Sequence, residues 1–292
     1  MNTLEKRRYK TANIISLLAN APIVALPAFL LINLHYINTL KLTGFIITET
    51  LCILFGTIFP ILLVLFWSKY VDTDPDISNK EDRPYPLLIG AILYFIGAIF
   101  LHIFNAPAIS ICLIICYGIN TFAVLLITFF WKISIHAIGT PGPTTGLMTA
   151  YNPYGAILGL ILPLVMWSRV KLEKHTINQV ISGATLGFIL TIPLMKILLS
   201  LYGITLNTTP IIFYSISLIS IPIILTILGY TQQSENKIKK LIIYPISLIY
   251  IIIFCSISPL AAKILLILSG LISIIVTCFA GDEFLWYKGL KI

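Results

Sequence analysis

Residues 86–104 read PLLIGAILYFIGAIFLHIF, and residues 107–131 read PAISICLIICYGINTFAVLLITFFW. Neither stretch contains an Asp, Glu, Lys or Arg. A helix needs about 20 apolar residues to cross the hydrocarbon core of a bilayer, and both stretches are close to that length or longer. Only Asn105 and Ala106 separate them. The two stretches therefore predict a pair of antiparallel membrane-spanning helices.

The rest of the chain has the same character. Of its 292 residues, 58% are apolar and only 10% are charged, and the mean hydropathy is +1.00. Soluble domains carry roughly 25% charged residues. The composition therefore excludes a soluble enzyme, a disordered chain and a disulfide-linked secreted module. The expected fold class is all-α, a polytopic membrane helix bundle with no sizeable domain outside the bilayer.

Apolar runs of spanning length occur throughout the chain. A Pro and a Gly within residues 152–155 divide one longer run into two short helices. The Pro-rich run at 139–146 predicts an irregular segment that lines a cavity, because unpaired backbone is tolerated in a membrane only where protein or water satisfies it. About ten helices are expected, at residues 11–33, 44–67, 86–104, 107–131, 134–150, 154–168, 177–202, 210–230, 241–258 and 260–281.

The net charge of +8 indicates membrane topology and not a nucleic-acid partner, because the basic residues lie in short loops between apolar runs. With ten crossings, the N-terminus, four of the loops and the C-terminus share one face. All but three of the 19 Lys and Arg lie on that face, the exceptions being Lys41, Lys196 and Lys263. The positive-inside rule predicts that this face is cytoplasmic. The expected location is the cell membrane.

Three polar islands interrupt the apolar runs, at residues 69–86, 132–136 and 168–179. All three lie on the predicted cytoplasmic face, and together they contain two imidazoles and several cations. This set fits phosphoryl transfer, in which cations bind phosphate oxygens, one His attacks phosphorus and another protonates the departing oxygen. His175 and Gln179 are four residues apart, so the amide oxygen is expected to fix the tautomer of the imidazole.

The islands resemble the three motifs of the type 2 phosphatidic acid phosphatase superfamily, in the order in which that family has them. The resemblance covers about residues 69–190. The residues that carry it are Lys80 with Arg83-Pro84 for the first motif, Ser134-Ile135-His136 for the second, and Ser168-Arg169 followed by His175 and position 179 for the third.

The resemblance implies a six-helix phosphatase-like core within residues 44–202, preceded by residues 1–43 with one extra helix and followed by extra helices in 203–292. It implies His175 as the nucleophile that forms a phosphohistidine, and His136 as the general acid. No cofactor is expected, because the family usually works without a metal. The substrate implied is a phosphomonoester or diphosphate of a lipid or isoprenoid. The implied phosphate-binding residues are Lys80, Arg83, Ser134 and Arg169.

Several positions depart from the family pattern. Gln179 stands where the family has Asp, and Ile135 where it has Gly. Lys80 lies three residues before Arg83 instead of seven, and the position seven residues before is Asp76. An amide at 179 keeps a hydrogen bond to the catalytic imidazole but lacks the charge that stabilises an imidazolium.

Two other functions stay open. Asp72, Asp76 and the residues up to Pro84 also look like the first aspartate-rich loop of the UbiA superfamily of membrane prenyltransferases, which implies Mg²⁺ bound by Asp72 and Asp76. That family's second aspartate-rich loop is missing here. A transporter or a catalytically silent binding protein is the third possibility. The intramembrane charges Glu49 and Lys196 are the feature that would favour it. The sequence does not indicate an oligomeric state.

Overall fold

The structure is a computed structural model of the chain, and it describes residues 3–216 and 219. Every regular element in these residues is helical, which confirms the all-α class for this part of the chain. Residues 209–216 are also helical. The elements are α1 (Thr3–Leu18), α2 (Ala21–His35), α3 (Ile37–Ile53), the π-helical η1 (Leu54–Ile58), α4 (Phe59–Tyr70), α5 (Pro84–Ile103), α6 (Ala108–Thr128), α7 (Ile135–Gly139), α8 (Pro141–Tyr151), the 3-10 helix η2 (Asn152–Leu160), α9 (Ile161–Lys171) and α10 (Ile177–Leu201).

Within the described residues, five helical stretches are long and apolar enough to cross a membrane, and a bent pair gives a sixth. The bent pair is α1 with α2, which meet at an angle of 52°. The expected helices at 241–258 and 260–281, and most of 210–230, lie outside the described residues. The five stretches are Ile37–Tyr70, Pro84–Ile103, Ala108–Thr128, Tyr154–Lys171 and Ile177–Leu201.

The region expected to hold two short helices is more finely divided. α7 and α8 are separate helices, and η2 continues directly into α9. The run at 139–146, expected to be irregular, is largely helical, so that expectation is wrong. The reason is that Pro141 and Pro143 lie in the first turn of α8, where backbone N–H groups have no acceptor within the helix and a missing N–H costs little.

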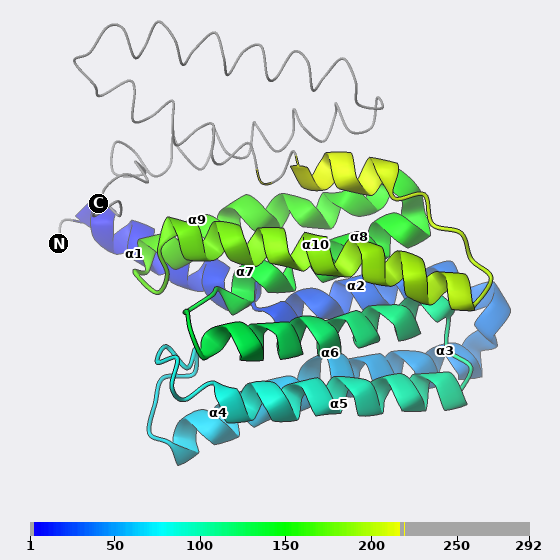
Figure 1. The fold of residues 1–292 in the computed structure, drawn as a ribbon, viewed down its shortest axis with the longest axis horizontal. Helices are drawn as coiled ribbons and strands as arrows, with labels where there is room; N and C mark the ends of the chain where they lie inside the picture. The colour runs from blue at the N-terminus through cyan, green and yellow to red at the C-terminus, as the bar shows by residue number, and fades with distance from the viewer. Residues whose placement is uncertain (1–2, 217–218, 220–292) are drawn as a thin grey trace, which may run out of the picture.

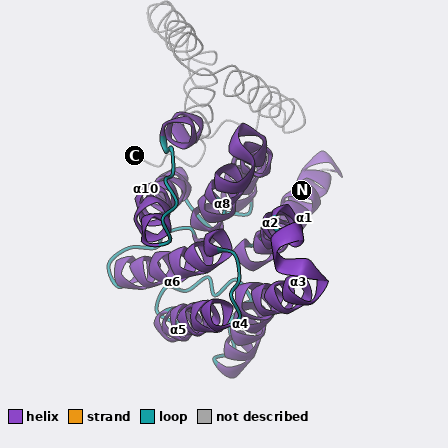
Figure 2. Ribbon diagram, turned by 90° about the vertical axis from the view of Figure 1, so that its right-hand side faces the viewer, coloured by secondary structure: helices purple, strands orange, loops and turns teal. Residues whose placement is uncertain are grey.

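α6 lies in the middle of the bundle. Both views show it between α5 on one side and α10 with α8 on the other (Figures 1 and 2). The contact of α10 with α7 depends on two glycines of α10. A Cβ on Gly183 would lie 2.7 Å from the carbonyl oxygen of Ser134, and one on Gly187 would lie 2.9 Å from that of Ile138. These close approaches seat α7, which carries His136, against the first half of α10.

The two ends of the bundle carry different polar groups. At one end lie the loops between α4 and α5, between α6 and α7, and between α9 and α10 (left in Figure 1). Toward the other end, the buried Asn33 donates from Nδ2 to Oε2 of Glu49 at 2.8 Å and accepts from Oγ of Ser110 at 2.7 Å. The carboxylate within the α3 span therefore has a hydrogen-bond partner.

Candidate functional site

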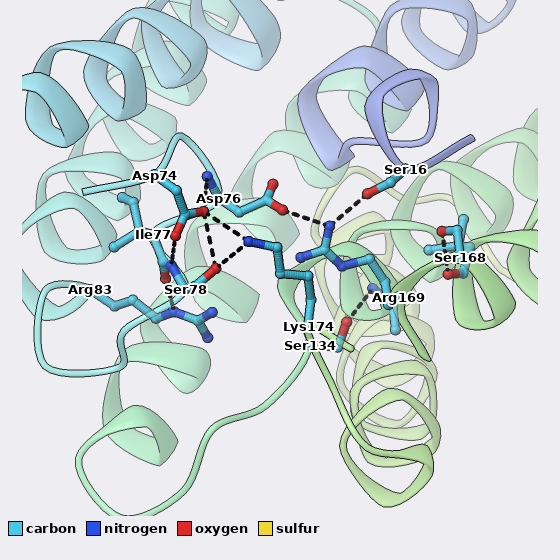
Figure 3. Close-up of polar contacts among 12 residues, drawn as sticks. Ser16, Asp74, Asp76, Ile77, Ser78, Arg83, Ser134, Ser168, Arg169 and Lys174 are labelled. Carbon is cyan, nitrogen blue, oxygen red and sulfur yellow. Dashed lines mark hydrogen bonds and ion pairs between the residues drawn. The ribbon is translucent and has the colours of Figure 1, made fainter. Parts of the chain in front are cut away.

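The three polar islands meet at one end of the bundle, although up to 100 residues separate the side chains that touch. Nζ of Lys174, after α9, lies 2.9 Å from Oγ of Ser78 and 3.4 Å from Oδ1 of Asp74, both before α5 (Figure 3). Nη1 of Arg83 donates to the carbonyl oxygen of Ile133, before α7, at 3.2 Å. Side-chain bonds therefore tie the first island to each of the other two.

Arg83 is a buried cation without a counter-ion. Its side chain donates from Nε to the carbonyl oxygen of Ile77 at 2.7 Å, and the residue is 2% exposed. No ion pair joins it to a carboxylate within the described chain. Burial, and then the charge of Arg169, lower the pKa of Arg83 to about 10, against smaller opposing effects of Asp76 and Asp74. A buried charge that is not paired with an opposite charge is costly, so this position favours an anionic ligand.

Arg169 is the second buried cation, at 1% exposure. Its Nη1 lies 2.9 Å from Oδ2 of Asp76 and donates to Oγ of Ser16 at 2.6 Å. Its Nε is buried and has no hydrogen-bond partner among the described residues. Helix α1 thus contributes to the site through Ser16. Sequence reasoning did not identify this residue, because nothing in the α1 sequence distinguishes it.

The turn after α9 places His175 close to Arg169. The carbonyl oxygen of Arg169 accepts from the N–H groups of Lys174 at 3.1 Å and of His175 at 3.3 Å. Glu173 adopts φ 56 in this turn, the left-handed conformation that commonly ends a helix. The chain then enters α10 through Thr176, whose Oγ1 accepts from the backbone N–H of Gln179 at 3.4 Å.

The hydrogen bond expected from the spacing of His175 and Gln179 is present. Nδ1 of His175 lies 3.1 Å from Oε1 of Gln179, which also accepts from the N–H of Thr176 at 3.1 Å. Because an amide oxygen only accepts, Nδ1 carries the proton and Nε2 keeps its lone pair. Burial, then the charges of Arg169, Arg83 and Lys132, lower the pKa of His175 to about 2, against a smaller opposing effect of the Gln179 bond. The imidazole is therefore neutral at neutral pH.

His136 lies at the start of α7, where the charges of the same two guanidinium groups act on it. Burial, and then the charge of Arg169, lower its pKa to about 3; Asp76 opposes this shift, and Arg83 adds to it to a smaller extent. Ser134 caps this helix, since its Oγ accepts from the N–H of Ala137 at 3.3 Å. The N–H of Ser134 also donates to the carbonyl oxygen of Gln179 at 3.3 Å, which links α7 to the first turn of α10.

The remaining two residues expected to bind phosphate are Ser134 and Lys80. The hydroxyl of Ser134 is used by the helix cap, and Lys80 makes no side-chain hydrogen bond in the described chain. Two lysines near the guanidinium groups stand out instead. Lys132 is half-buried, and burial, followed by the charges of Arg83, Lys174 and Arg169, lowers its pKa. We call Arg83, Lys132, Arg169 and Lys174 the cation cluster.

In the loop before α5, Asp72, Asp74 and Asp76 differ in their partners. Asp76 pairs with Arg169, and Asp74 accepts from the N–H of Asp76 at 3.0 Å and from both donors of Ser78. Asp72 is exposed and makes no side-chain hydrogen bond with any described residue. Across residues 3–216, no three His, Cys, Asp or Glu side chains gather closely enough to suggest a metal site.

Comparisons with protein-family models, with curated proteins and with solved structures find no match to this chain. The chemistry of the site therefore rests on its geometry alone. A cation cluster that exceeds its nearby carboxylates, next to two neutral imidazoles, can bind a phosphate and present a nitrogen lone pair to it.

Proposed function

We propose that the protein is a membrane phosphatase that hydrolyses a phosphomonoester or diphosphate of a lipid or isoprenoid through a phosphohistidine intermediate. The observation that carries the proposal is the buried Arg83 without a counter-ion, beside a neutral His175 whose Nε2 is free to react. Phosphoryl transfer needs this combination, since cations must stabilise the equatorial oxygens while a nucleophile approaches in line.

The proposed reaction has two steps. Nε2 of His175 attacks the terminal phosphorus, the bond from that phosphorus to the leaving oxygen breaks, and that oxygen takes a proton from His136. The leaving oxygen belongs to the lipid in a monoester and to the inner phosphate in a diphosphate. Water then attacks the phosphohistidine, the phosphorus–nitrogen bond breaks, and the proton released by the water passes to His136. The products are inorganic phosphate and either the dephosphorylated lipid, from a monoester, or the lipid monophosphate, from a diphosphate. Both imidazoles return to their starting protonation states.

His136 has to be protonated for the first step, yet burial and the charge of Arg169 lower its pKa to about 3. A phosphate dianion bound by the cation cluster offsets the positive charges that lower this pKa. Binding of the substrate therefore charges the general acid.

The proposal includes the arrangement in the membrane. About ten helices cross or enter the bilayer of the cell membrane, with residues 44–202 as the phosphatase-like core. The cation cluster lies at the cytoplasmic interface, where the phosphorylated head group reaches it while the lipid tail stays between apolar helix surfaces. The charge distribution of the loops supports this orientation.

Replacement of His175 by Ala tests the mechanism. The wild-type protein in detergent micelles is expected to release phosphate from phosphatidic acid or farnesyl diphosphate and to form an acid-labile phosphoprotein. His175→Ala should lower turnover by about 10³-fold or more and abolish the phosphoprotein, because the nucleophile is gone. His136→Ala should lower turnover by about 10²- to 10⁴-fold.

His102→Ala is the matched control, since this exposed histidine lies at the other end of the bundle, where its ring contacts Tyr202. Its turnover should equal that of the wild type. Unchanged turnover in a folded His175→Ala variant would contradict the mechanism. No hydrolysis of either substrate by the wild type would favour a binding or transport role.

A further inference from the structure

Arg169 is held at only one of its three nitrogens. Nη1 contacts both Asp76 and Ser16, which approach it from different segments of the chain (Figure 3). Nε has no partner, and Nη2 makes no hydrogen bond with any residue between 3 and 216. Nε and Nη2 share one edge of the guanidinium, and that edge can donate two parallel hydrogen bonds to two oxygens of one phosphate. The edge suited to a phosphate is thus unpaired.

The loop that carries Asp76 is fixed by its own contacts. The N–H of Asp76 donates to Oδ1 of Asp74, and Nε of Arg83 donates to the carbonyl oxygen of Ile77. Ile77 is buried and adopts φ 45, a conformation that a β-branched residue rarely adopts unless its surroundings impose it. The carboxylate of Asp76 is therefore presented to Arg169 by a constrained backbone.

Ser16 is fixed by the packing of α1 against α9. Ala12, one turn earlier in α1, is fully buried in a cluster with Trp167 and Leu172, which flank Arg169 in the sequence. Because α1 rests on the segment that carries Arg169, its serine reaches Nη1 from a defined direction. The orientation of the guanidinium group therefore depends on three segments: α9, which carries it, and α1 and the loop before α5, which contact it.

We infer that Asp76 and Ser16 are positioning residues, which hold Nη1 of Arg169 so that its Nε–Nη2 edge receives phosphate oxygens. This inference rests on the proposed function in one respect, namely that the anion bound by the cation cluster is a phosphate. Neither residue has to touch the substrate. A competing role for Asp76, as an anion that occupies the phosphate position until the substrate displaces it, predicts the opposite effect on phosphate affinity.

The affinity of the purified full-length protein for inorganic phosphate separates the two roles. Asp76→Ala should weaken binding by about 10- to 100-fold, because the guanidinium loses the partner that orients its charge-assisted hydrogen bonds. Asp76→Asn should restore affinity to within about threefold of the wild type, because the amide oxygen still accepts from Nη1. Ser16→Ala should weaken binding by about 2- to 10-fold.

Asp72→Asn is the control, since this exposed aspartate lies in the same loop and asparagine tolerates its φ of 52. Its affinity should be unchanged. If Asp76→Ala does not fold, Ser16→Ala and Asp76→Asn still decide between the roles. Tighter or unchanged binding in Asp76→Ala and Ser16→Ala would overturn the inference, as would a wild type that binds no phosphate. A wild type that binds phosphate without hydrolysing either substrate overturns the proposed reaction only.

Discussion

The two histidines of the site are neutral because burial and the charges of Arg169 and Arg83 lower the pKa of both. An unfolded histidine has a pKa near 6.5. The folded pKa values of His136 and His175 are about 3 and about 2, so both are below the unfolded value. Below pH 6.5 the unfolded chain therefore binds more protons than the folded protein, and the stabilisation present above that pH is lost as the pH falls.

We expect each histidine to lower the free energy of unfolding by about 1.4 kcal/mol for each pH unit below 6.5, since each is more than nine-tenths buried. Denaturant unfolding of the purified protein in micelles between pH 5 and 7 measures this dependence. His136→Asn and His175→Asn should each remove one histidine's share of the slope. If both variants kept the slope of the wild type, the folded protein would not be lowering the pKa of these imidazoles.

At the residue scale, local contacts could be predicted and distant ones could not. The His175–Gln179 bond was predicted from the four-residue spacing and is present, although His175 lies just before the N-cap Thr176 and not within α10. The Asp76–Arg169 pair joins residues 93 positions apart, and no pattern in either segment indicates it. Asp76 was therefore interpreted as a departure from a motif or as a magnesium ligand, whereas the structure places it against a buried arginine.

At the element scale, the position of His136 depends on how closely α7 approaches α10. We expect Gly183→Ala to destabilise the protein by about 1–3 kcal/mol, because its Cβ would lie 2.7 Å from a backbone oxygen that cannot move without shifting α7. The same shift should lower turnover if His136 is the general acid. Unfolding in micelles and the phosphate-release assay measure the two effects.

Gly90→Ala is the matched control in α5, where the nearest atom to an added Cβ is 3.8 Å away. Alanine there should be neutral or should stabilise the helix by up to about 1 kcal/mol through its helix propensity. Equal effects of the two substitutions would show that the α7–α10 contact is not tight.

The length and hydrophobicity of the long helices made them predictable. The division at α7 and α8 was not, because it depends on Pro141 and Pro143 falling in a first helical turn.

At the scale of the whole molecule, the cation cluster lies at one end of helices that are long enough to cross the bilayer. α5 has 20 residues and α10 has 25, so they are about 30 Å and about 37 Å long. α10 begins beside the cation cluster and ends at Leu201, just before the exposed loop that contains Asn207. Asn207 and the loop before α5 therefore lie at opposite ends of the bundle, and in a membrane they face opposite sides.

We expect the cation cluster to face the cytoplasm, because most of the Lys and Arg lie in loops on its side. Single cysteines at Glu81 and Asn207, both exposed, report the orientation in a background in which Cys255 and Cys278 are serine. The remaining cysteines are buried. A membrane-impermeant maleimide should label Asn207→Cys on intact cells and Glu81→Cys only after permeabilisation. The reverse pattern would place the site outside, where it could act only on lipids of the outer leaflet.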